Sequence, residues 1–81
     1  SPKISVDEEK IIVREDIFTK TKRINWNDVK EITFKSFALD ILLKNNKEEL
    51  VILRTNAEVS IEVKALLREV ANKKMIQVKG G

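Results

Sequence analysis

The sequence predicts an α+β domain that is mainly β, with about six antiparallel strands followed by one amphipathic helix. Apolar and polar residues alternate in several segments up to Leu53, which is the period of a strand. Between Val59 and Val70 the apolar spacing changes to three and four residues, which is the period of a helix. A chain of 81 residues is the length of one domain, so we expect residues 1–81 to fold as a single unit.

The first predicted element is a hairpin over residues 4–13. Ile4 alternates with Val6, and Ile11 alternates with Val13, as expected for two half-buried strands. The acidic segment Asp7-Glu8-Glu9 separates them and predicts the turn.

A corner in the chain is predicted after the next strand, which ends near Trp26. Apolar spacing changes from two to three residues here and then returns to two, and Asn27-Asp28 favours a turn at this point. We expect a structural corner with its tryptophan in the core, because tryptophan is mostly buried and this one follows the apolar period. The corner residues are Ile24, Trp26, Val29 and Ile32.

A second hairpin is predicted over residues 34–55, with Asn45-Asn46 at its turn. A loop of two or four residues would place Leu50 and Ile52 on one face with four apolar residues of the preceding strand. These four are Phe37, Leu39, Ile41 and Leu43. The opposite face would then carry the three residues that we regard as a candidate partner-contact face, Leu42, Val51 and Leu53.

The last element is a helix whose apolar positions are Val59, Val63, Leu66, Leu67 and Val70. Lys73 and Lys74 lie near its predicted end, where cations favour the helix dipole. The tail that follows contains Met75, Ile76 and Val78, which either pack against the domain or fray.

Together these residues resemble the pattern of bacterial pleckstrin-homology-like (PH-like) domains, found in small membrane-attached bacterial proteins of unknown function. The resemblance rests on Lys22-Arg23, Ile24, Trp26, Val29 and Ile32, and on the final amphipathic helix. It implies a partly open barrel of seven strands in two sheets, capped by the helix. We count six strands, so the seventh would lie in residues 17–21 or before Ser1. The resemblance also implies a fragment of a longer membrane-anchored protein, with this domain on the cytoplasmic side of the membrane.

Composition argues against an enzyme. The chain has no histidine and no cysteine, which removes the commonest general base and the usual transition-metal ligands. Its only two glycines are Gly80 and Gly81, so a glycine-rich phosphate loop is excluded. We therefore expect no catalytic residue, metal, cofactor or small-molecule substrate. The acids Asp7, Glu8 and Glu9 would repel an inositol phosphate at the first hairpin loop, where PH-like lipid binders carry cations.

Three non-catalytic functions follow from these observations. The first is a PH-like module that binds a protein partner or associates with itself. The second is weak binding to anionic membrane surfaces through Lys20, Lys22 and Arg23, although these cations also fit a solvated strand edge. A further cationic cluster, Lys73, Lys74 and Lys79, has the same two interpretations. Nucleic-acid binding comes last and is not expected, because a net charge of +3 is small and the aromatics follow apolar periods.

Overall fold

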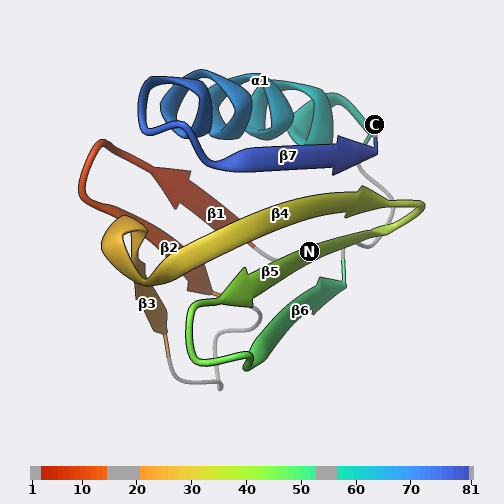
Figure 1. Ribbon diagram of the computed structural model, residues 1–81. Coiled ribbons are helices and arrows are strands. Elements are labelled where there is room, and N and C mark those ends of the chain that lie inside the picture. Colours follow the sequence, from red (N-terminus) through yellow and green to blue (C-terminus); the bar gives the residue numbers. More distant parts are fainter. Residues whose placement is uncertain (1–2, 15–20, 53–56, 81) are drawn as a thin grey trace.

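The computed structural model describes residues 3–14, 21–52 and 57–80, and it places them in two sheets and one helix (Figure 1). The strands are β1 (Lys3–Val6), β2 (Lys10–Arg14), β3 (Lys22–Asn25), β4 (Val29–Lys35), β5 (Ala38–Leu43), β6 (Glu48–Ile52) and β7 (Gln77–Gly80). The helix α1 spans Ala57–Lys73, and a short 3-10 helix, η1, spans Trp26–Asp28. The mainly β architecture with one helix near the C-terminus is confirmed, and the two sheets do not close into a barrel.

The first sheet has three strands in the order β1-β2-β3, all antiparallel. Val6 pairs with Ile11, and Ile11 pairs with Ile24, so apolar residues of the three strands meet on one face. Ile11, Val13 and Ile24 are buried there, as the alternation in the sequence predicts.

The second sheet has four strands in the order β6-β5-β4-β7 and is not purely antiparallel. Strand β7 runs parallel to β4, with Ile32 paired to Val78 and Phe34 to Gly80. The expectation of antiparallel strands alone is therefore wrong for this pair, and one further strand lies in the tail, after the helix. The crossover through α1 makes the parallel pairing feasible, because parallel strands need a long connection. Of the two places expected for an additional strand, residues 17–20 and the chain before Ser1 lie outside the described residues.

The turn between β5 and β6 corrects the predicted faces of this hairpin. The Leu43 amide donates to the Lys47 carbonyl oxygen at 2.8 Å, which leaves a loop of three residues, 44–46. Asn46 takes the positive φ of 67° that such loops require. A loop with an odd number of residues shifts the strand register by one residue relative to a loop with an even number. A shift of one residue moves every side chain of the strand to the opposite face of the sheet. Leu39 consequently pairs with Val51, so the predicted grouping of Leu39 with Leu50 and Ile52 is wrong.

The helix α1 packs against β1 and β7 and buries Leu67, Val70 and Ala71, with Val63 half-buried beside them (Figure 1). Leu66 is 46% exposed, contrary to its predicted place in the apolar stripe. Adjacent helical residues point about 100° apart, so only one of the two leucines reaches the core. Within the described residues, no helix is long and apolar enough to cross a membrane.

Phe37 also departs from the expected face. It occupies the two-residue turn between β4 and β5 with a φ of 61°, and 71% of its surface is exposed. The buried apolar cluster instead consists of residues from both sheets, η1 and α1: Ile11, Val13, Ile24, Trp26, Val29, Ile32, Phe34, Leu39, Ile41, Leu67, Val70 and Ala71.

Candidate anion-binding groove

The corner between the two sheets is formed by η1, and its local sequence explains its shape. The Asn25 side chain accepts a hydrogen bond from the Asn27 amide at 2.9 Å, as an N-cap residue does. The Val29 amide donates to the Trp26 carbonyl oxygen and closes the turn. Ile24, Trp26 and Val29 of the predicted corner therefore lie at the junction of β3 and β4, whereas Ile32 lies in the middle of β4. Trp26 is only 1% exposed.

Trp26 also fixes the acidic β1–β2 turn to this corner. Its indole Nε1 donates to the Asp7 carbonyl oxygen at 2.8 Å, and its amide donates to the Glu9 carbonyl oxygen at 3.0 Å. The Asp7 carboxylate accepts the amides of Lys10 and Glu9, both at 2.8 Å. These two hydrogen bonds favour the ionised form and lower the pKa of Asp7. The acidic segment thus has a structural role in the turn.

The end of α1 lies beside the same corner. The Ile76 amide donates to the Ala71 carbonyl oxygen, and the Met75 amide donates to that of Asn72, which together form a Schellman motif. Met75 occupies the left-handed position of this motif with a φ of 58°, and 94% of its surface is exposed. The motif turns the chain back so that β7 can pair with β4.

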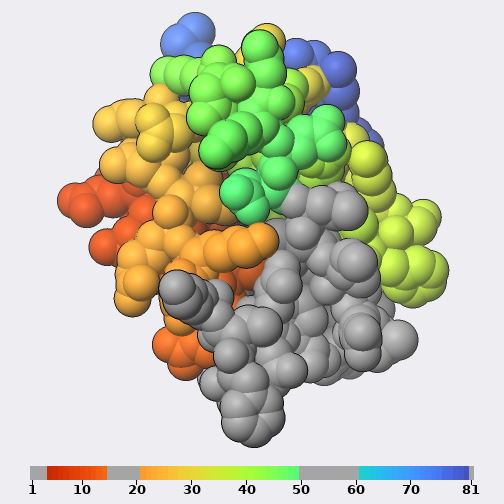
Figure 2. Space-filling model, turned by 90° about the horizontal axis from the view of Figure 1, so that it is seen from below, coloured from red at the N-terminus to blue at the C-terminus, as the bar shows by residue number. Residues whose placement is uncertain are grey.

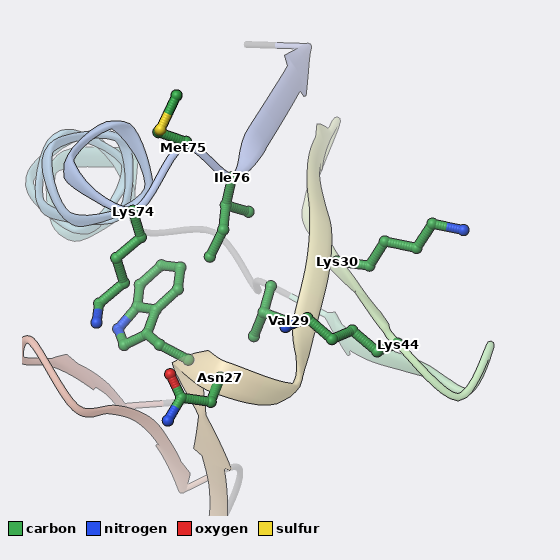
Figure 3. A pocket seen from close by; sticks show the side chains of 8 residues that line it. Asn27, Val29, Lys30, Lys44, Lys74, Met75 and Ile76 are labelled. Atoms are coloured by element: carbon green, nitrogen blue, oxygen red, sulfur yellow. The ribbon is translucent and has the colours of Figure 1, made fainter.

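These elements surround an open groove with a volume of about 450 Å³ (Figure 3). Its residues come from η1, the start of β4, the β5–β6 loop and the end of α1, and Trp26, Val29 and Ile76 supply its apolar part. Lys74 lies beside the indole ring, whereas Lys30 extends away from it (Figure 3). The full lining is Trp26, Asn27, Val29, Lys30, Lys44, Lys74, Met75 and Ile76.

Lys30, Lys44 and Lys74, which we call the groove lysines, form no ion pair within the described part of the chain. All three are exposed. Four other lysines of the described residues have carboxylate partners, and Lys10, Lys47 and Lys64 do not. The four pairs are Lys22 with Glu49, Lys35 with Asp40, Lys73 with Glu8 and Glu69, and Lys79 with Glu31. An external anion at the groove would therefore meet the ammonium groups of Lys44 and Lys74, with that of Lys30 extending outward from its rim.

Two exposed acids near the corner limit this positive charge. Asp28 lies in η1, and Glu9 is joined to Trp26 through its backbone, although neither belongs to the groove lining. Negative charges beside the groove reduce its positive electrostatic potential, and salt screens the potential that remains. An anion should consequently bind weakly and with strong dependence on ionic strength.

The cations predicted as an anionic-surface contact are arranged differently. Lys20 lies outside the described residues, while Lys22 and Arg23 are neighbours on β3 and so point to opposite faces of the sheet. The Lys22 ammonium lies 3.2 Å from the Glu49 carboxylate, which joins the edge of the first sheet to the edge of the second. Figure 2 shows β3 beside the β5–β6 hairpin on this face.

The second cationic cluster of the sequence is divided as well. Lys73 and Lys79 have carboxylate partners, and Lys74 alone lines the groove. Sequence reasoning did not find the groove lysines as a group, because they lie on three separate segments that only the fold brings together. The one partial signal was the position of Lys74 at the helix end.

The candidate partner-contact face is separated by the hairpin register. Val51 is the register partner of Leu39, whereas Leu42 is the partner of Glu48. Leu39 and Leu42 are three positions apart, which places them on opposite faces of β5. Leu42 is half-buried, while Leu53 and the side chain of Val51 lie outside the described residues, so a contact through these residues stays a prediction.

The described residues contain no group of acidic side chains that could hold a metal ion. No family model, curated protein or solved structure matches the chain. The groove geometry is therefore the basis for a functional proposal.

Proposed function

We propose that this chain is a non-catalytic PH-like interaction module that binds anionic lipid surfaces through the groove. The observation that carries the proposal is the gathering of Lys30, Lys44 and Lys74 around an apolar-lined groove, without carboxylate partners among the described residues. A lipid leaflet rich in anionic headgroups supplies the missing negative charge. In a bacterium this leaflet would be the cytoplasmic face of the membrane.

The expected strength follows from the number of cations. Each lysine near an anionic leaflet contributes about 1 kcal/mol, so three contribute about 3 kcal/mol, or about a hundredfold in affinity. Such binding is reversible and weakens as salt rises. Membrane binding of this strength would add to a second membrane attachment elsewhere in a longer protein.

The type of cation favours lipid over a defined acidic protein. The groove cations are all lysines, which are flexible point charges. Recognition of a carboxylate on a folded partner favours the rigid two-pronged geometry of arginine. Mobile headgroups adapt to flexible ammonium groups without fixed geometry.

The PH-like part of the proposal is supported by the two sheets, the helix and the corner at Trp26. The structure differs from the PH-like pattern in one respect: strand β7 follows the helix and pairs with β4. The proposed binding region lies at the corner of the two sheets, beside the acidic β1–β2 turn and not at its tip.

The test is co-sedimentation with vesicles of phosphatidylcholine, alone or mixed with phosphatidylserine, at about 0.02 M and about 0.5 M salt. We expect binding only to the anionic vesicles and only at low salt. The triple variant Lys30→Gln, Lys44→Gln, Lys74→Gln should lose this binding.

A second triple variant is the matched control because it removes the same charge from the cations predicted from sequence. This variant, Lys20→Gln, Lys22→Gln, Arg23→Gln, should retain most of the binding. Equal loss of binding in both variants would mean that net charge alone drives vesicle binding, and it would overturn the proposal that the groove is the binding site. Absence of wild-type binding to any vesicle would overturn the lipid proposal and return the search to a protein partner.

A further inference from the structure

We infer that Met75 is an insertion residue, an apolar side chain that enters the lipid interface while the groove lysines contact the headgroups. The inference rests on the proposed function and deepens it, because it specifies which end of the molecule faces the bilayer. It is carried by a separate set of observations on the backbone and exposure of Met75.

The backbone position of Met75 is unfavourable for methionine. With a φ of 58°, Met75 lies in the left-handed region at the helix end, where glycine is the common residue. A side chain with a Cβ atom is strained there, whereas glycine is not. The fold alone would therefore favour glycine at this position.

Packing within the domain does not compensate for that strain. The Met75 side chain is 94% exposed, and its neighbour Ile76 supplies the apolar contact with the buried cluster. Asn46 also has a positive φ, but asparagine tolerates that conformation and belongs to an ordinary hairpin loop. Uncompensated strain of this kind clusters at functional sites. Phe37 shares the positive φ and the exposure at the far end of β4, so the position of Met75 next to Lys74 in the groove distinguishes it.

The surroundings of Met75 match the layered chemistry of a bilayer surface. Met75 adjoins Lys74 and belongs to the same groove lining as Lys44 and Lys30, and its side chain projects outward from the turn after α1 (Figure 3). Peripheral membrane segments combine these features, with cations at the level of the phosphates and apolar groups at the acyl boundary. A flexible thioether adapts to disordered acyl chains without a preformed pocket.

Met75→Gly is an unusually clean test, because the substitution removes the side chain and relieves the backbone. The variant should fold at least as well as the wild type by urea denaturation, yet bind phosphatidylserine vesicles about tenfold more weakly. Phe37→Gly is the matched control. Phe37 is also an exposed apolar residue at a positive φ, but it lies at the far end of β4 from the groove, so vesicle binding should not change.

A direct readout of insertion comes from Met75→Trp with vesicles that contain brominated acyl chains. Quenching of the new fluorophore beyond that of the buried Trp26 is expected if residue 75 reaches the acyl boundary. A Phe37→Trp variant should show no such quenching.

The outcomes separate this inference from the proposed function. If Met75→Gly binds vesicles like the wild type while the groove-lysine variant fails to bind, the lipid surface remains the partner of the groove. That result would overturn the insertion of Met75. Loss of wild-type binding to all vesicles would remove both. Tight binding to soluble polyglutamate that exceeds binding to vesicles would also overturn insertion, because it would favour an acidic protein segment.

Discussion

Replacing Trp26 is the sharpest test of how the corner between the two sheets is stabilised. Trp26→Phe keeps an aromatic ring but removes the hydrogen bond to the Asp7 carbonyl oxygen, which is 2.8 Å long. That bond contributes about 0.5–1.5 kcal/mol. The smaller ring also leaves a void at a site that is 1% exposed, at about 1 kcal/mol for a methyl-sized gap. We expect a total loss of about 2 kcal/mol in the free energy of unfolding.

Urea denaturation followed by far-ultraviolet circular dichroism measures this loss, because the variant lacks the chain's one tryptophan. With a slope of about 1–2 kcal/mol per molar urea for so small a domain, the midpoint should fall by about 1–2 M. Trp26→Ala should lose about 3–5 kcal/mol, a large share of the stability of an ordinary domain.

Phe37→Ala is the control for loss of an aromatic ring, since Phe37 projects from the β4–β5 turn. Its free energy of unfolding should change by less than about 0.5 kcal/mol. A Trp26→Phe variant as stable as the wild type would refute the reasoning, because it would mean that neither the hydrogen bond nor the packing of the indole stabilises the corner.

Three other predictions concern stability. Gly80→Ala should lose about 1–3 kcal/mol in urea denaturation, because Gly80 has a φ of 78° and a Cβ there would overlap the Phe34 carbonyl oxygen; an unchanged midpoint would contradict the β4–β7 pairing. The lowered pKa of Asp7 means that its carboxylate stabilises the fold above its unfolded pKa, and that this contribution is lost as pH falls through the folded pKa. Asp7→Asn should therefore flatten the pH dependence of unfolding below about pH 4, and an unchanged profile would refute this role. Met75→Gly should gain up to about 1 kcal/mol, since relief of the left-handed strain outweighs the added entropy of the unfolded chain, and a clear loss would refute the strain.

Much of the fold could be predicted because periodicity reports burial directly. The alternation of Ile11 with Val13 predicted the core face of β2, and the change of spacing after Trp26 predicted a break in the strand. In each case the chain itself carries the spacing that packing requires, so no contact between distant segments had to be known.

The β5–β6 register could not be fixed in the same way. Asn45-Asn46 marks a turn but does not determine whether the loop has an even or an odd number of residues, and this parity decides the faces. The outcome depends on Asn46 taking the left-handed conformation and on the hydrogen bond between Leu43 and Lys47.

Strand β7 and the groove were beyond local patterns for a different reason. Four residues give too short an alternation to separate a strand from a frayed tail, and the pairing of β7 with β4 follows from the turn at Met75. The groove lysines are distant in sequence and become neighbours only through η1, the β5–β6 loop and the end of α1.

The central claim is that anionic lipid binds at the groove, and amide NMR shifts test it most directly. The isotope-labelled protein would be titrated with small phosphatidylserine bicelles at low salt. We expect the largest changes on the backbone amides of Asn27, Lys30, Lys44 and Lys74–Ile76, and high salt should reverse them. Changes concentrated on Lys22 and Arg23 of β3, with the groove amides unaffected, would contradict the claim.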